Sequence, residues 1–259
     1  MLGIEDKVAV VTGATQGLGK AMAFELAAHG AKVVLAARGE AGGARTVEEL
    51  SATGASCIFQ PTDVARYDNV EALVDRAVDQ YGRVDIMINN AGIFIGGSPT
   101  EMAVDDWNRV IDVNLSGVYY GARAAGRRMI EQGDGGRIVN VSSIIGVVGK
   151  LLCSAYTASK GAVNALTRNL AIDLARYGIL VNAIVPGVCD SEINVHVAID
   201  DRRRSEAKIP LGRWGSPAEI AKGVVFLCSD MATYVTGTTL IVDGGYVTGT
   251  EIRSGDSIL

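Results

Sequence analysis

Short apolar runs alternate with segments of helical period along the whole sequence, and this alternation limits the folds open to the chain. The predicted strands are Lys7–Thr12, Lys32–Ala37, Ser56–Gln60, Val84–Asn89, Arg137–Ser142, Leu180–Val185 and Thr239–Asp243. Their apolar residues are nearly continuous, which is typical of a parallel sheet covered on both faces. The alternation predicts an α/β fold: an open, doubly wound, Rossmann-like parallel sheet of about seven strands with helices on both faces.

The segments between these strands are predicted as helices. They are Arg45–Thr53, Tyr67–Tyr81, Met102–Glu131, Ala155–Tyr177, Pro217–Ser229, and a helix that ends near Gly30. Residues 188–211 show no clear period, so we predict an irregular segment that serves as a substrate lid. A chain of 259 residues can bury one large core, and we expect a single domain over residues 1–259.

The charge and cysteine content narrow the partners and the compartment. The net charge is −5, which gives no reason to expect a nucleic acid or an anionic membrane as partner. No apolar run approaches the roughly 18 residues of a membrane-spanning helix. The 4 cysteines and 2 histidines are scattered without metal-ligand spacing, so we expect buried free thiols and no metal site. We therefore expect a soluble, cytoplasmic protein.

A glycine-rich loop follows the first predicted strand and leads directly into a helix. It contains Gly13, Thr15, Gln16, Gly17, Leu18 and Gly19. Glycines allow the backbone to approach a pyrophosphate closely, and a helix N-terminus supplies free N–H groups and a positive dipole. The glycine spacing differs from the G-x-G-x-x-G fingerprint, but the position after the first strand predicts a dinucleotide site.

The end of the second strand bears on the choice of coenzyme. An NAD-binding protein usually carries Asp or Glu there, to bind the ribose hydroxyls. This chain has Ala36, Ala37 and Arg38 instead, and Arg38 is able to pair with a 2′-phosphate. The sequence therefore favours NADP(H). The alternative is NAD(H), with Arg38 solvated and Glu40 reaching the ribose.

Other strand ends add small and polar residues to the same edge of the sheet. Asp63 and Val64 follow the third strand, Asn90-Ala91-Gly92 follows the fourth, and Pro186-Gly187 ends the sixth. In a doubly wound sheet the cofactor crevice lies at the carboxyl ends of the strands. Asp63 is a candidate to accept a hydrogen bond from an adenine amino group, to cap the next helix, or to do both.

Tyr156 and Lys160 are the candidate catalytic pair. They lie four residues apart in a predicted helix, so both side chains project from one face. A phenol has a pKa of about 10, and a neighbouring ammonium is expected to lower it toward the working range of a general acid or base. A serine hydroxyl at the end of the preceding strand, from Ser142 or Ser143, would hydrogen-bond a substrate oxygen. Asn114 is an unfavourable residue for a helix interior, which suggests that it bends the helix or holds a water.

Taken together and in order, these motifs resemble the short-chain dehydrogenase/reductase family over nearly the whole chain. The resemblance is carried by Thr12-Gly13-x3-Gly17-x-Gly19, Asn89-Asn90-Ala91-Gly92, Asn114, Ser143, Tyr156-x3-Lys160 and Pro186-Gly187. It implies that Ser143 rather than Ser142 is the catalytic serine and that Tyr156 is the general acid/base. It also implies that Lys160 hydrogen-bonds the nicotinamide ribose and that Asn114 supports a water-linked proton relay.

The resemblance also implies the residues that bind the coenzyme. They are Gly13, Thr15, Gln16, Gly17, Leu18, Gly19, Arg38, Asp63, Val64, Asn90, Ala91, Gly92, Tyr156, Lys160, Pro186, Gly187, Val188 and Ser191. Ser191 stands where the family often has a threonine, which weakens that one assignment. Members commonly assemble as tetramers through their two long helices, here around 102–131 and 155–177, so we expect a homotetramer or a homodimer.

The implied activity is an NAD(P)(H)-dependent oxidoreduction between a secondary alcohol and its ketone. Residues 93–100 and 144–153 are mostly apolar, which favours a hydrophobic cyclic small-molecule substrate over a free sugar. One alternative is a 3-oxoacyl-thioester reductase, with Arg127, Arg128 and Arg202–Arg204 meeting an acidic carrier. A remote alternative is a dinucleotide-binding regulator without catalysis, which has no need of a complete Asn-Ser-Tyr-Lys set.

Overall fold

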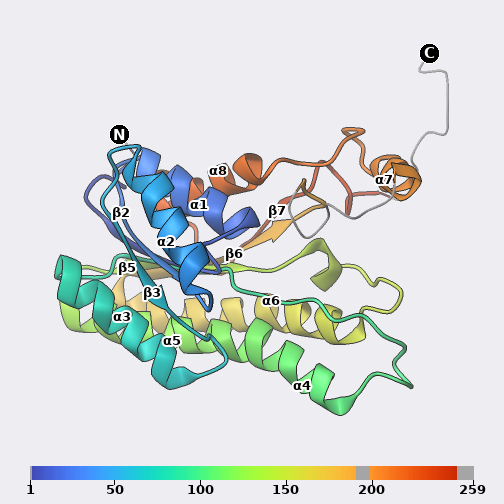
Figure 1. Ribbon diagram of the computed structural model, residues 1–259, viewed down its shortest axis with the longest axis horizontal. Coiled ribbons are helices and arrows are strands. Elements are labelled where there is room, and N and C mark those ends of the chain that lie inside the picture. The colour runs from blue at the N-terminus through green and yellow to red at the C-terminus, as the bar shows by residue number, and fades with distance from the viewer. Residues whose placement is uncertain (1, 191–198, 250–259) are drawn as a thin grey trace.

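A parallel sheet forms the centre of the computed structural model, which describes residues 2–190 and 199–249 (Figure 1). Its seven strands lie in the order β3-β2-β1-β4-β5-β6-β7. Their bounds are β1 Val8–Thr12, β2 Lys32–Ala37, β3 Cys57–Pro61, β4 Ile86–Asn89, β5 Gly136–Val141, β6 Ile179–Pro186 and β7 Thr239–Val242. Every neighbouring pair is parallel. The predicted fold class is confirmed, and each predicted strand is present with its ends shifted by no more than two residues.

Helices cover both faces of the sheet (Figure 1). One layer contains α1 Gly17–Ala28, α2 Glu40–Ser51 and α8 Pro217–Cys228, and the other contains α3 Tyr67–Tyr81, α5 Gly117–Gln132 and α6 Ser154–Leu174. Successive side chains of each strand point to opposite faces of the sheet, so they pack alternately against the two helix layers. Ala9 and Val11 of β1 join the core under α1 and α8, whereas Val8 and Val10 join the core under α3 and α5.

Two segments differ from the prediction because contacts between distant residues decide them. Helix α2 begins at Glu40 rather than Arg45, although Gly42 and Gly43 are poor helix formers. A β-carbon on Gly43 would overlap the Phe59 ring, so glycine allows this turn to pack tightly on β3. The segment predicted as irregular contains the helix α7, Ile199–Glu206. It shows no apolar period because nearly all its residues are charged, and ion pairs support it instead.

The segment predicted as one helix, 102–131, is helical from Val104 to Gln132, but it is not α-helical throughout. It consists of α4 Val104–Ile111, a π-helical turn Asp112–Ser116, and α5. Asn114 lies in the π turn and is completely buried. Single π turns inside α-helices are rare and occur frequently at functional sites. The structure shows a change of helix type at Asn114, while the expectation that Asn114 bends the helix or holds a water stays a prediction.

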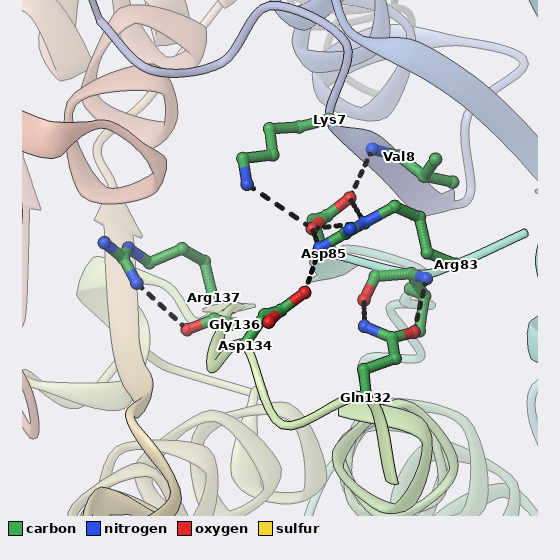
Figure 2. A network of polar contacts seen from close by, with 9 residues as sticks. Lys7, Val8, Arg83, Asp85, Gln132, Asp134, Gly136 and Arg137 are labelled. Carbon is green, nitrogen blue, oxygen red and sulfur yellow. Dashed lines mark hydrogen bonds and ion pairs between the residues drawn. The ribbon is translucent and has the colours of Figure 1, made fainter. Parts of the chain in front are cut away.

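The amino-terminal ends of the strands are joined by an ionic network around buried Asp85 (Figure 2). Its carboxylate accepts hydrogen bonds from the Val8 amide (2.9 Å) and from the Arg83 guanidinium (2.7 Å), and Lys7 lies 3.6 Å away. The Gln132 side chain hydrogen-bonds both the amide and the carbonyl of Val84. This network holds β1, β4 and the end of α5 together at the edge opposite the carboxyl ends of the strands.

Candidate active site

The carboxyl end of β5 and the first turns of α6 bring Ser143, Tyr156 and Lys160 together. The side chains of Ser143 and Tyr156 are hydrogen-bonded, and the Lys160 Nζ lies 5.8 Å from the centre of the Tyr156 ring. Tyr156 is partly exposed, whereas only 3% of Lys160 is exposed. A hydroxyl pair that opens to solvent next to a buried cation is able to bind and protonate a carbonyl oxygen.

The two adjacent serines have different surroundings. Ser142 is buried, and its hydroxyl donates to the Lys160 carbonyl at 2.9 Å. Ser143 caps a short 3₁₀ turn, Ile144–Gly146, where its hydroxyl accepts from the Ile145 amide at 3.2 Å, and it also reaches Tyr156. Only Ser143 therefore faces the candidate proton-transfer group.

Burial dominates the electrostatics of the pair. It raises the pKa of Tyr156, and the hydrogen bond from Ser143 acts in the opposite direction. Burial also lowers the pKa of Lys160 to about 8, and its Nζ donates to the Val141 carbonyl at 2.8 Å. We expected Lys160 to lower the pKa of the phenol. That expectation was wrong for this structure, because desolvation of the phenolate outweighs the other influences on Tyr156.

Asn114 holds the backbone next to this pair. Its Oδ1 accepts from the Ile93 amide at 2.8 Å, and its Nδ2 donates to the Ile93 carbonyl at 2.9 Å and to the Ser159 hydroxyl at 3.2 Å. A β-carbon on Gly92 would lie 3.3 Å from Asn114 Oδ1 and 3.5 Å from Lys160 Nζ. The predicted residues Asn114 and Lys160 thus meet at Gly92, where a side chain would fill the space between them.

The glycine loop forms a cradle that depends on the absence of side chains. Gly13 has a φ of +66°, and a β-carbon on Gly19 would overlap the Gly13 carbonyl oxygen. The Asn90 side chain donates to the carbonyls of Thr12 (2.8 Å) and Gly13 (3.3 Å), which joins the fourth strand to the loop. Helix α1 has neither a side-chain cap nor an acidic residue in its first turn, so its N-terminal dipole suits a phosphate. The residues present fit a dinucleotide pyrophosphate.

Arg38 lies beside this loop, at the end of β2. The Ala14 amide donates to the Ala36 carbonyl at 3.1 Å, which fixes the loop against that strand end. Arg38 is exposed and makes no hydrogen bond or ion pair with another residue in the described ranges. Glu40, the alternative ribose contact, is exposed in the first turn of α2. A free cation at this place fits a 2′-phosphate.

The remaining predicted coenzyme residues lie along the same edge. Arg66 is the N-cap of α3, so the interpretation of Asp63 as the cap was wrong; Asp63 instead accepts from the Ala65 amide. Val64 is buried against Gly117, and a β-carbon on Gly187 would lie 2.6 Å from the Asp243 Cα. Ser191 lies outside the described residues.

The sequence reasoning missed Thr12 as a part of the site. Its hydroxyl accepts from the amides of Asn90 (3.0 Å) and Ala91 (3.1 Å) and donates to the Ile88 carbonyl. This fixes the segment after β4 against the glycine loop. The position of Thr12, directly before Gly13, was the available signal.

Four exposed apolar side chains lie in the segments that follow β4 and β5, and we call them the apolar rim: Phe94, Val147, Leu151 and Leu152. The Phe94 ring meets the Tyr156 ring edge to face, with centres 5.5 Å apart. These residues belong to the apolar segments 93–100 and 144–153 of the sequence, and their role as a substrate pocket stays a prediction.

The arginines considered for an acidic partner are largely paired within the chain. Arg127 pairs with Glu71, and Arg128 pairs with Asp75 and Glu131. Arg202 pairs with Asp190 and Glu206 and lies over the Trp214 ring. Arg204 pairs with Asp201, and both Arg203 and Arg204 are exposed. Most of the arginines proposed to bind an acidic carrier therefore already have carboxylate partners in the chain, which weakens that hypothesis.

Two further observations concern metals and membranes. Within residues 2–190 and 199–249, no group of three His, Cys, Asp or Glu side chains is placed to hold a metal ion. No helix in that part of the chain is both long and apolar enough to span a membrane.

Comparisons with known proteins agree with this geometry. The family model described as enoyl-(acyl carrier protein) reductase matches residues 13–247. The chain is 43% identical to an L-rhamnose 1-dehydrogenase (NAD(P)(+)) of Azotobacter vinelandii, over 93% of this chain and 96% of the relative. It is 42% identical to a cis-4-hydroxycyclohexanecarboxylate dehydrogenase of Sinomonas cyclohexanicum, over the same shares. A solved gluconate 5-dehydrogenase from Burkholderia cenocepacia, in complex with NADP and tartrate, superposes with a TM-score of 0.91 at 33% identity, covering 96% of this chain and 98% of that one.

Proposed function

The chain belongs to the short-chain dehydrogenase/reductase family, and from this premise we propose that Ser143, Tyr156 and Lys160 carry out its chemistry. The protein is an NAD(P)(H)-dependent oxidoreductase that interconverts secondary alcohols and ketones. The observation that supports the residue assignment best is the Ser143–Tyr156 hydrogen bond beside the buried ammonium of Lys160.

The coenzyme, when bound, supplies the hydride donor or acceptor. Gly13, Gly17 and Gly19 would hold its pyrophosphate, and Arg38 would bind a 2′-phosphate, so NADP(H) is favoured with NAD(H) as the alternative. The other residues assigned to it are Thr15, Gln16, Leu18, Asp63, Val64, Asn90, Ala91, Gly92, Pro186, Gly187, Val188 and Ser191.

The residues of the chain handle the proton and the substrate oxygen. The hydroxyls of Ser143 and Tyr156 bind the oxygen, and Tyr156 donates the proton in ketone reduction or accepts it in alcohol oxidation. Lys160 would hydrogen-bond the nicotinamide ribose, and Asn114 holds the backbone of Ile93 next to the Lys160 ammonium.

The substrate assignment is a hydrophobic cyclic secondary alcohol. The exposed rim of Phe94, Val147, Leu151 and Leu152 supports it, because a bound apolar molecule would remove that surface from water. One relative is named for a sugar and another for a hydroxylated cyclohexane, so the family itself leaves the choice open.

The test is coenzyme oxidation by the purified protein with cyclohexanone, beside a 3-oxoacyl thioester, each with NADPH and with NADH. We expect turnover of cyclohexanone, faster with NADPH. Turnover of the thioester alone would instead establish the acyl-thioester alternative. Absence of hydride transfer with every substrate would favour the regulator.

Assembly as a homotetramer or homodimer through 102–131 and 155–177 is part of this proposal. Five large hydrophobic side chains on these helices are exposed: Val104 and Trp107 on α4, Tyr119 and Ile130 on α5, and Ile172 on α6. A second copy would cover such surface. Light scattering after gel filtration tests it: the wild type should elute as a dimer or tetramer, and Ile172→Asp with Trp107→Asp should reduce the mass. A monomeric wild type would contradict the assignment.

We also propose a domain organisation and a cellular location for the protein. Residues 1–259 form a single domain, with 188–211 as the lid; of that lid, 191–198 lie outside the described residues. The Arg202–Asp190 ion pair ties α7 to the end of β6. No disulfide joins Cys57, Cys153, Cys189 and Cys228, which suits the reducing cytoplasm.

A further inference from the structure

We propose that Phe94 determines substrate specificity, because its half-exposed ring forms an apolar wall beside Tyr156 that selects an apolar ring and rejects a polyol. This inference rests on the proposed function, with Tyr156 as the residue that binds the substrate oxygen. It assigns the preference between an apolar ring and a polyol, which differs among the relatives, to one side chain.

The contact between the two rings places Phe94 next to the reacting oxygen. Their centres are 5.5 Å apart and their planes are inclined by 76°, which is an edge-to-face pair. Tyr156 is partly exposed, and 53% of Phe94 is exposed. A substrate oxygen on the Tyr156 hydroxyl would therefore bring the rest of the substrate close to the open part of the Phe94 ring.

On the side away from Tyr156, the Phe94 ring lies close to the backbone of Gly96. A β-carbon on Gly96 would lie 3.1 Å from Phe94 Cζ and 3.2 Å from the Leu152 carbonyl oxygen. That carbonyl accepts from the Gly97 amide at 3.0 Å, which joins the two loops of the rim. Leu152 has a φ of +59°, a left-handed conformation that only one other non-glycine residue in the described ranges adopts. Such conformations persist where the surrounding contacts enforce them, so the backbone at Leu152 is held in place by its neighbours.

The chemistry of the rim separates two classes of substrate. The exposed side chains of the rim, Phe94, Val147, Leu151 and Leu152, consist only of carbon and hydrogen, and Leu151 is 85% exposed. A saturated ring would bury this surface favourably. A polyol would have to give up water at several hydroxyls without new partners on these four side chains, and an unpaired polar group carries a penalty.

The experiment compares oxidation of cyclohexanol and of L-rhamnose by the full-length protein with its preferred coenzyme. We would measure kcat/KM for wild type, Phe94→Leu and Phe94→Ala. Phe94→Ala should lower the ratio of cyclohexanol to L-rhamnose by about tenfold to a hundredfold, because a pocket contact of this size changes discrimination by that order. Phe94→Leu should keep most of the ratio, and coenzyme affinity should stay at the wild-type value in both.

Tyr234→Ala is the matched control, because Tyr234 is a fully exposed aromatic residue at the opposite edge of the sheet. The neighbouring Val235 and Gly237 are hydrogen-bonded to residues 181 and 182, near the start of β6. This variant should leave both substrates unaffected. If Phe94→Ala fails to fold, Gly96→Ala displaces the same ring by direct contact and should also lower the ratio.

Three results would overturn the inference. Equal losses on both substrates would show that Phe94 only supports Tyr156, and the proposed function would stand. A wild type that oxidises L-rhamnose but no cyclic alcohol would remove both the substrate class and the wall. If no turnover occurs, saturation-transfer NMR of the two probes with NADP⁺ gives the binding preference, and an unchanged preference in Phe94→Ala would reject the wall independently of catalysis.

Discussion

The Ser142 hydroxyl donates to the Lys160 carbonyl, 2.9 Å away, and so ties the end of β5 to the helix that carries Tyr156. The next residue, Ser143, hydrogen-bonds Tyr156 itself. One residue of the Ser-Ser pair therefore faces the core and the other faces the site.

This difference predicts opposite effects for two serine substitutions. Ser143→Ala should lower kcat by about 10²–10³-fold, as the loss of an oxyanion donor does, with little change in stability. Ser142→Ala should lower the free energy of unfolding by about 1 kcal/mol and leave kcat nearly unchanged. Urea unfolding and steady-state kinetics on both variants check this. A larger kcat loss in Ser142→Ala would reverse the assignment.

Tyr156→Phe should bind coenzyme normally and lose turnover by about 10²–10⁴-fold, because it removes the group that transfers the proton. Coenzyme fluorescence and steady-state kinetics measure the two effects separately. Tyr234→Phe, which removes an exposed hydroxyl at the opposite edge, is the control and should retain activity. Near-normal turnover in Tyr156→Phe would refute the proposed role.

Lys160→Met should change how stability depends on pH. The folded pKa of about 8 lies below the usual 10.5, so the unfolded chain binds this proton more tightly. The cost of burying the charge is complete below pH 8 and disappears as the pH rises to 10.5. Relative to the variant, the wild type should therefore gain up to about 3 kcal/mol over that interval.

Urea unfolding at pH 7 and pH 10 measures this change. Lys222→Met removes an exposed lysine of α8 and is the control; its difference from wild type should be the same at both pH values. A pH-independent difference for Lys160→Met would contradict the buried charge.

Arg38→Leu should change the coenzyme preference. Loss of a charge-assisted hydrogen bond to a 2′-phosphate should lower kcat/KM for NADPH by about tenfold to a hundredfold and leave NADH unaffected. Arg76→Leu, an exposed arginine of α3, serves as the control. If Arg38→Leu affects the two coenzymes equally, Arg38 does not read the phosphate, and Glu40 becomes the better candidate for the ribose contact.

Asp85→Asn should destabilise the fold without changing the chemistry. Removal of one partner from a buried ion pair costs about 3–5 kcal/mol, and Asp85 joins β1 to β4 far from the site (Figure 2). Asp134→Asn removes an exposed partner of the same Arg83 and should cost less than about 1 kcal/mol. Thermal unfolding of both, with kcat measured well below the transition, tests the difference. Equal losses would show that burial of Asp85 has no special weight.

The sequence alone determined the layout of the sheet and the place of the chemistry. The strands follow from continuous apolar runs, and the Tyr156–Lys160 relationship follows from the period of one helix; both signals are local in the chain. The motifs after β1, β4 and β5 converge because parallel strands end at one edge. For that reason the fold class and the convergence of Ser143, Tyr156 and Lys160 could be predicted from residues alone.

Tertiary contacts decided what depends on residues far apart in the chain. The π turn at Asn114 accompanies hydrogen bonds to Ile93, the early start of α2 goes with Gly43 against Phe59, and α7 is supported by an ion pair with Asp190. The raised pKa of Tyr156 and its contact with Phe94 likewise depend on burial by other elements. Periodicity records which face of an element is apolar, but hydrogen-bond partners and desolvation exist only once the elements pack, because both depend on distances between atoms that the order of residues leaves open.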